Sequence, residues 1–247
     1  MKKYELKLDR RNFLKNSVML SLVSIAPGVF FQELSHGRAL DEPASKKIRW
    51  GMLINTDLCS EDCNACVTAC NEEHGIEDFG RPDSDTQWIR KLNLTDEFSG
   101  KKYSLPMMCQ HCENPPCVDV CPTGASFKRA DGIVLVNKHT CIGCRYCMMS
   151  CPYKARSFVH ENLENQLPHA PRGKGCVESC NLCVHKIDKG DENTACSAAC
   201  QKDGNKAILF GDLNNPESEI SKQLLKYGGK QIRNDLGLNT AVRYRGI

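Results

Sequence analysis

The sequence is poor in large apolar side chains: aromatic residues make up 6% of its 247 residues, and only two of them are tryptophan. A core with so few large side chains buries little apolar surface, which offsets only part of the conformational entropy lost on folding. Covalent or metal cross-links are therefore expected to contribute to the stability of the fold. The sequence also lacks a glycine-rich nucleotide loop, a nucleophile elbow and a zincin motif. Nucleotide-dependent, serine-hydrolase and zinc-protease chemistries are therefore disfavoured.

Positive charge is scarce outside the first forty residues. The formal net charge is +3, but residues 1–39 hold seven of the 33 basic residues and three of the 30 acidic ones. The remainder has 26 basic and 27 acidic residues, a net charge of −1. Such a chain is not expected to present a basic face to nucleic acid, so no nucleic-acid partner is predicted.

The N-terminus has the features of an export signal. A twin-arginine pair, Arg10 and Arg11, precedes a moderately apolar run over 18–31 that is too short to span a bilayer. Residues 37–39, Gly-Arg-Ala, supply small side chains of the kind that a signal peptidase reads. We therefore predict that residues 1–39 are a twin-arginine signal peptide, which exports the folded chain to the outer (periplasmic) face of the cytoplasmic membrane. The alternative is an amphipathic helix with a chance pair of arginines.

Sixteen of the seventeen cysteines fall into four groups along the chain. Group one is Cys59, Cys63, Cys66 and Cys70; group two is Cys109, Cys112, Cys117 and Cys121; group three is Cys141, Cys144, Cys147 and Cys151; group four is Cys180, Cys183, Cys196 and Cys200. Group three reproduces the bacterial ferredoxin pattern C-x2-C-x2-C-x3-C-P, in which three cysteines wrap one cluster and the fourth ligates its neighbour. The four groups predict four [4Fe–4S] clusters with these sixteen cysteines as iron ligands, and Cys176 is surplus.

Three other interpretations of the cysteines are weaker. Zinc ribbons use separate C-x2-C pairs rather than four closely spaced cysteines. Disulfides would leave one of seventeen cysteines unpaired, and a route that exports folded proteins favours a cofactor loaded beforehand. The spacing of Cys59, Cys63 and Cys66 also occurs in radical S-adenosylmethionine sites, as does that of Cys176, Cys180 and Cys183. Those enzymes keep one iron open, whereas Cys70 can supply a fourth thiolate.

Strands and helices are expected beside each cysteine group. Short apolar runs that abut turn residues predict strands over 132–136, 157–160 and 206–210. Helices are expected to begin near Cys66, Cys121, Cys151 and Cys200, with the prolines after Cys121 and Cys151 in the first turn. The polar, cysteine-free segment 211–247 is expected to be an extended tail that wraps the domain or contacts a partner.

A few other side chains are candidates for supporting roles. His111, between two cysteines, is expected to be a hydrogen-bond donor or a packing residue rather than a ligand. Arg145, Lys154 and Arg156 could offset cluster charge, dock partners or form ordinary solvated surface. Gly143 and Gly124 are expected where backbone must approach sulfur without a side chain in the way.

From Trp50 to about Arg245 the chain resembles the four-cluster ferredoxin-like subunits of membrane-bound oxidoreductases, of polysulfide, nitrite and dimethyl sulfoxide reductase types. The resemblance rests on residues 108–117, 141–147, 151–156 and 210–214. Within that family the widened loop from Cys59 to Cys63 is similar to the exported iron–sulfur subunit of sulfite-reduction-associated Dsr complexes, called DsrO, or HmeA in the related menaquinol-oxidising complex.

The resemblance implies crossed ligation between groups. One pair of clusters would be held by Cys59, Cys63, Cys66 and Cys200, and by Cys180, Cys183, Cys196 and Cys70. The other pair would be held by Cys109, Cys112, Cys117 and Cys151, and by Cys141, Cys144, Cys147 and Cys121. Gln201 departs from the proline often found after the last cysteine, and Cys176 could compete with Cys196 as a ligand.

The implied fold is α+β, with two bacterial 2[4Fe–4S] ferredoxin-like units, the second inserted in the first. Residues 48–105 and 165–210 would form the outer unit, 106–164 the inserted unit and 211–247 the tail.

The implied function is electron relay without bond-making chemistry. The expected partners are an NrfD-type integral membrane quinone-reactive subunit, a multihaem cytochrome c subunit and further Dsr-type subunits, in menaquinone-linked sulfur metabolism. Three alternatives remain: the electron-transfer subunit of an exported molybdopterin reductase, a catalytic iron–sulfur enzyme with one labile iron, and a freely diffusing ferredoxin shuttle.

Overall fold

A three-stranded sheet joins the two ends of the part of the chain that is described, in the order β8-β1-β9. The computed structural model describes residues 42–164, 166–203 and 206–247, so the predicted signal peptide lies outside the described residues. Strand β1 (Trp50–Asn55) pairs antiparallel with β8 (Ile208–Asp212) and parallel with β9 (Val242–Arg245). Its apolar run is buried on both faces, as expected for a central strand.

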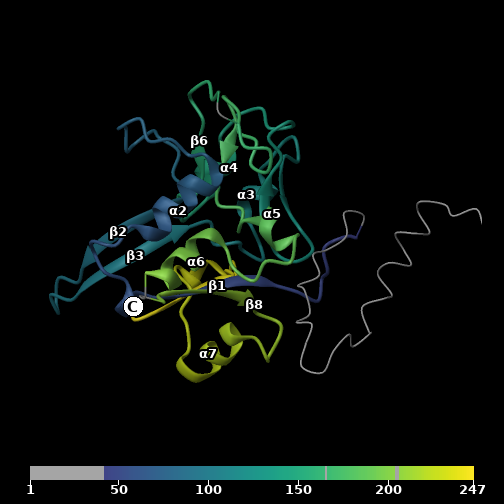
Figure 1. Cartoon of the computed structure of the whole chain (residues 1–247). Helices are drawn as coiled ribbons and strands as arrows, with labels where there is room; N and C mark the ends of the chain where they lie inside the picture. Colours follow the sequence, from purple (N-terminus) through teal and green to yellow (C-terminus); the bar gives the residue numbers. More distant parts are fainter. Residues whose placement is uncertain (1–41, 165, 204–205) are drawn as a thin grey trace, which may run out of the picture. The chain divides into compact units, whose positions relative to one another are not determined.

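Three two-stranded sheets complete the strands of the described residues. The hairpin of β2 (Ile89–Thr95) and β3 (Lys102–Met108) is the longest of them (Figure 1). The other pairs are β4 (Ser126–Lys128) with β5 (Val134–Val136), and β6 (Ser157–Phe158) with β7 (Val177–Glu178). The three predicted strands are confirmed as β5, β6 and β8, and the mixture of strands and helices agrees with the α+β class.

The helices beside the cysteine groups are short. The longer ones are α2 (Ala65–His74) and α6 (Ala195–Lys202), which contact each other. The others are α3 (Pro116–Asp119), α4 (Tyr146–Ser150) and α5 (Val184–Ile187), and a 3-10 turn, η2, spans Thr56–Leu58. No helix of the described residues combines the length and the apolar character needed to cross a bilayer.

Most of the predicted helix starts are wrong. Only α2 begins near its expected position, at Cys66; α3 ends before Cys121, α4 ends before Cys151, and Cys200 lies in the last turn of α6. A proline disfavours helical backbone in the residue before it, and Cys151 accordingly has extended backbone, with ψ 111°. The prolines after the fourth cysteines therefore stop helices instead of starting them.

The prediction of an extended C-terminal tail is also wrong for most of its length. Helix α7 (Glu219–Tyr227) begins at the Ser218 cap and packs against β8, and Ile220 on its inner face is fully buried (Figure 1). A 3-10 turn, η3 (Asn234–Leu236), follows, and β9 then enters the central sheet. The apolar residues of this segment are few but are placed where they can be buried, so the segment completes the fold.

Candidate metal centres

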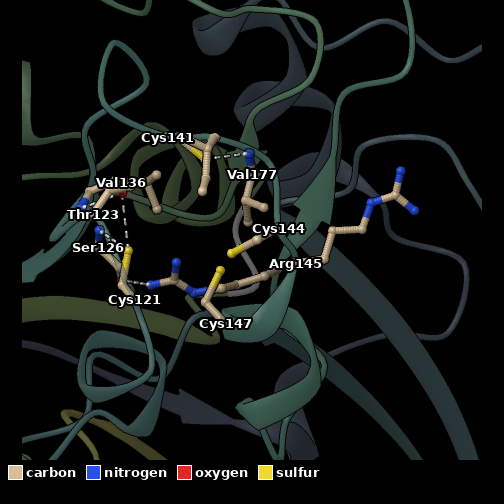
Figure 2. Close-up of a pocket in the computed structure, with 12 residues that line it drawn as sticks. Cys121, Thr123, Ser126, Val136, Cys141, Cys144, Arg145, Cys147 and Val177 are labelled. Atoms are coloured by element: carbon tan, nitrogen blue, oxygen red, sulfur yellow. Dashed lines mark hydrogen bonds between the residues drawn. The ribbon is translucent and has the colours of Figure 1, made fainter.

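Two pockets are each lined by four cysteines from two different groups. One is lined by Cys121, Cys141, Cys144 and Cys147 (Figure 2). The other is lined by Cys109, Cys112, Cys117 and Cys151. In each case the last cysteine of one group faces the first three cysteines of the other, which is the crossed pattern that the resemblance implied.

The remaining eight cysteines also lie close to one another. The sulfur of Cys59 lies near Cys200 and Cys63, and Cys66 lies near Cys196 as well as near Cys59, Cys200 and Cys63. Cys70 lies near Cys196, Cys183 and Cys66, and Cys180 lies near Cys70 and Cys196. These contacts agree with the division of the eight that the resemblance implied, and we use that division to number four sets: set 1 is Cys59, Cys63, Cys66 and Cys200; set 2 is Cys70, Cys180, Cys183 and Cys196; set 3 is Cys109, Cys112, Cys117 and Cys151; set 4 is Cys121, Cys141, Cys144 and Cys147.

The crossing follows from the helices that carry the cysteines. Cys66 and Cys70 are four residues apart on α2, so they share one face, and Cys196 and Cys200 do the same on α6. Because α2 and α6 pack together, each helix contributes one cysteine to set 1 and one to set 2. Two sites thus form on either side of one helix contact.

Neighbouring sets lie close together in a fixed order. Cys66 of set 1 lies near Cys196 of set 2, Cys180 of set 2 lies near Cys109 of set 3, and Cys117 of set 3 lies near Cys147 of set 4. The sets therefore follow one another in the order 1, 2, 3, 4 through the protein.

Solvent exposure differs between the ends and the middle of this series. All eight cysteines of sets 2 and 3 are buried. In set 4, Cys144 is exposed and two others are half-buried; in set 1, Cys59 and Cys63 are half-buried. The interior of the series is closed to water, and each end reaches the surface.

The buried thiols suit a metal cluster better than a disulfide. All seventeen cysteines are free of disulfide bonds. Burial is the largest cause that raises the pKa of Cys66, Cys109, Cys112 and Cys196 to about 12. Thiols held in this way stay protonated unless a metal replaces the proton, and four soft sulfurs in one tetrad match the ligand preference of iron–sulfur clusters.

Backbone amides are directed at the same sulfurs. Cys121 accepts a hydrogen bond from the Ser126 amide at 3.3 Å, and Cys200 accepts one from the Ala207 amide at 3.2 Å. Cys151, Cys141 and Cys183 accept comparable bonds at 3.4–3.5 Å. Such N–H donors favour the negative charge that thiolates and cluster sulfides carry. The fold thus prepares these sulfurs for an anionic group.

Two buried donors near set 3 have no protein partner among the described residues. His111 accepts the Val134 amide at Nδ1, at 3.0 Å, which leaves its buried Nε2 without a partner. Burial, followed by the nearby Arg156 charge, lowers the pKa of His111 to about 3, so the ring is neutral and Nε2 carries its proton. The buried Nη1 of Arg156 is likewise unpartnered. His111 is therefore a buried packing residue, one of the two roles predicted for it; that its Nε2–H donates a hydrogen bond to a cluster stays a prediction.

The basic side chains near the cysteines differ in whether they point to solvent or into the protein. Arg145 is exposed and points away from the set 4 sulfurs (Figure 2), and its guanidinium lies over the Phe158 ring at 3.8 Å from the centroid. Lys154 is also exposed, whereas Arg156 is buried and lines both the set 3 and the set 4 pockets. Of the three, only Arg156 is placed to offset cluster charge from within.

Cys176 lies beside set 4 and away from Cys196. Its thiol donates to the Lys138 carbonyl oxygen at 3.2 Å, and its nearest sulfur neighbour is Cys141. Cys196, in contrast, lies with Cys70 and Cys180. The structure therefore brings Cys196, and not Cys176, to set 2.

Two side chains that the sequence did not single out support the cysteine loops. Lys91 donates to the carbonyl oxygens of Ser60, Glu61 and Cys63, which fixes the widened first loop. The His74 ring packs against the Trp88 ring, with 4.4 Å between the centroids and a tilt of 37°, and its Nε2 lies 3.5 Å from the Cys183 sulfur. Both contacts depend on long-range packing, and no local sequence signal indicated them.

A second group of possible metal ligands is occupied by hydrogen bonds. Glu73, His169 and His185 place one ligand atom each within 4.8 Å of the others. However, His185 Nε2 lies 2.7 Å from the Glu73 carboxylate, His169 Nε2 lies 2.8 Å from the Glu73 carbonyl oxygen, and Lys186 approaches the same carboxylate at 3.7 Å. These contacts describe a hydrogen-bonded cluster that ties α2 to α5.

Comparison with known proteins agrees with this chemistry. Residues 58–125 and 101–212 match models described as 4Fe-4S dicluster domains. The chain is 42% identical to the Hdr-like menaquinol oxidoreductase iron-sulfur subunit 1 of Archaeoglobus fulgidus, over 82% of this chain and 85% of that protein. It is 34% identical to the menaquinone reductase iron-sulfur cluster-binding subunit of Nitratidesulfovibrio vulgaris, over 80% and 89%. It is also 31% identical to a tetrathionate reductase subunit of Salmonella typhimurium, over 97% and 88%.

These matches confirm the family that the cysteine spacing indicated. All three relatives are subunits of oxidoreductases, and the first two are named as iron–sulfur subunits. The chain belongs to the family of ferredoxin-like [4Fe–4S] electron-transfer subunits of membrane-associated oxidoreductases.

Proposed function

We propose that the chain relays electrons through four [4Fe–4S] clusters, one in each of sets 1 to 4. The carrying observation is the order of the sets: each lies near the next, the two inner sets are buried, and both ends reach the surface. A series with closed interior sites and accessible ends is suited to passing electrons between two partners.

The chain's own residues would hold and insulate the clusters. When bound, each cluster supplies a reversible one-electron carrier. Sixteen cysteines would fill the ligand positions, so no iron is left open for a substrate, which weighs against the catalytic iron–sulfur alternative. The nested arrangement, with 106–164 inserted between 48–105 and 165–210, is part of this proposal, since sets 1 and 2 draw only on groups one and four.

The proposed setting is the outer face of the cytoplasmic membrane. The twin-arginine pattern supports export of the folded protein. The relatives named as menaquinol oxidoreductase and menaquinone reductase subunits support a quinone-linked membrane partner. We propose an NrfD-type membrane subunit at one end, and a multihaem cytochrome c with further Dsr-type subunits of sulfur metabolism at the other.

The similarity to a tetrathionate reductase favours one alternative setting, in which the partner is an exported molybdopterin reductase. The relay itself would be the same in both settings. Only the protein that accepts or supplies electrons at one end would differ.

The relay is tested on protein prepared anaerobically with its partners. Iron and acid-labile sulfide should be close to sixteen of each per chain, about four for each of four cubanes. Reductive titration followed by EPR should show four one-electron centres. Zinc or disulfides in place of iron would refute the relay, and a signal that changes on substrate addition would favour the catalytic alternative.

The setting has its own test. Replacing Arg10 and Arg11 with lysine should retain the protein inside the cytoplasm, while the cluster content stays unchanged. Mass spectrometry of proteins that co-purify with the chain should identify either cytochrome c or molybdopterin subunits. Export that is unaffected by the double substitution would contradict the twin-arginine assignment.

A further inference from the structure

Arg156 is a buried cation without a carboxylate partner among the described residues. Its side chain is 5% exposed, and its hydrogen bond from Nη2 goes to the Ser126 hydroxyl oxygen at 2.8 Å. Nη1 is buried and has no protein partner. Two half-buried arginines have carboxylate partners instead: Arg172 pairs with Glu178 at 3.0 Å, and Arg129 pairs with Asp131 at 2.6 Å.

A guanidinium in such a place requires anionic neighbours, because removing an unpaired charge from water is costly. The neighbours of Arg156 are sulfurs: Cys109 and Cys117 of set 3, and Cys147 of set 4. The same guanidinium lines the pockets of both sets. Arg156 therefore lies between two proposed cluster sites and contacts both.

Sets 1 and 2 have no equivalent residue in the part of the chain that the structure describes. Lys91, near Cys59, is directed at backbone carbonyls of the surface loop. Lys186, near Cys183, is shared with the Glu73 carboxylate. In the buried interior, positive charge thus faces the cysteines of sets 3 and 4 rather than those of sets 1 and 2.

We propose that Arg156 is a positioning residue that raises the reduction potentials of the clusters in sets 3 and 4. The proposal rests on the relay described above. When an electron passes from set 2 to set 3, the donor cluster loses one unit of negative charge and the acceptor gains one. A fixed cation beside the acceptor stabilises the reduced form, and net charge and hydrogen bonds near the sulfurs are established determinants of cluster potential. Because Arg156 lies beside both sets, its charge favours an electron on set 3 or set 4 over one on set 1 or set 2.

The test compares four forms of the full chain, prepared with their partners: wild type, Arg156→Met, Arg156→Lys and the matched control Arg145→Met. Arg145 belongs to the same part of the chain, but its side chain points away from set 4 (Figure 2). Iron and sulfide are quantified first, and midpoint potentials are then measured by EPR-monitored redox titration.

We expect Arg156→Met to lower two of the four midpoint potentials and to leave the other two unchanged. Arg156→Lys should restore most of the shift, because it keeps the charge, and Arg145→Met should shift none. Fully loaded Arg156→Met protein with wild-type potentials would overturn the proposal. If Arg156→Met loses clusters, Arg156→Gln, which keeps N–H donors without the charge, is compared with Arg156→Lys. Loss of clusters in all three variants would show a role in assembly and would also overturn it.

The outcome for the relay is separate. Wild-type protein with fewer than four clusters would count against the proposed function, whereas four clusters with unshifted potentials count against Arg156 alone.

Discussion

Cys66 and Cys70 lie one helical turn apart on the same face of α2, and both lie near Cys196 of α6. Cys66 also lies near Cys59 and Cys200, whereas Cys70 also lies near Cys183. We assign the two sulfurs to different proposed sites, because α2 and α6 pack together and each carries two cysteines one turn apart. Neighbours in sequence are thus divided between two proposed cluster sites, and cysteines more than a hundred residues apart are brought together.

This arrangement predicts which cysteine substitutions affect the same cluster. Cys121→Ser should alter the EPR signal that Cys144→Ser alters, because both sulfurs line the set 4 pocket. Cys109→Ser, although it lies in the same sequence group as Cys121, should alter a different signal. Matching signals for Cys121→Ser and Cys109→Ser would contradict the crossed assignment.

Cys176 is predicted to be dispensable for cluster content. Because it lies beside Cys141 but outside the four sets, Cys176→Ser should leave iron and sulfide per chain unchanged. Cys141→Ser, its matched control, should remove or convert one cluster. Loss of about four iron atoms from the Cys176→Ser protein would show that Cys176 is a ligand.

Gly143 is predicted to be required for a close backbone approach. Its φ is +70°, and a Cβ at this position would lie 2.3 Å from the Gly175 carbonyl oxygen. Gly143→Ala should destabilise the protein by about 3 kcal/mol, through overpacking and left-handed strain together. The close approach that was also expected at Gly124 is not found among the described residues, because nothing lies within 4 Å of a Cβ there. Gly124→Ala is therefore the matched control: φ is +65°, and its cost should be about 1 kcal/mol. The stability of each variant is measured as the urea concentration at which half the cluster absorbance is lost. Equal midpoints for the two variants would contradict the predicted clash between a Cβ at position 143 and the Gly175 carbonyl oxygen.

Glu178 is predicted to anchor the segment before group four. It is fully buried, pairs with Arg172 and accepts the Trp88 indole N–H at 3.2 Å, while Arg172 also binds the Gly75 carbonyl oxygen. Glu178→Gln leaves the Arg172 charge buried without its partner and should cost about 3 kcal/mol. Glu161→Gln, which breaks the exposed pair with Arg81, should cost less than about 1 kcal/mol. Thermal unfolding under anaerobic conditions compares the stabilities of the two variants. Similar losses of stability would contradict the prediction that breaking the buried ion pair costs more than breaking the exposed one.

The sequence alone determined the chemistry of this protein. The spacing of group three is specific for [4Fe–4S] ligation, and apolar runs beside turns located β5, β6 and β8, because these signals are local and need only a few adjacent residues. The prolines after Cys121 and Cys151 are equally visible, but a proline fits the first turn of a helix and also disfavours helical backbone in the residue before it. In this structure the second effect decides, so the helices end before these prolines.

Only the tertiary structure decided how the cysteines are shared and what lies around them. The division of α2 between two sites, the contact of Cys180 with Cys109, and the entry of β9 beside β1 depend on packing between segments far apart in sequence. The placement of Arg156 between two sets, and of Cys176 outside them, depends on the same long-range contacts. Spacing fixes which atoms can bind iron, whereas burial and packing fix which four meet and which charges face them.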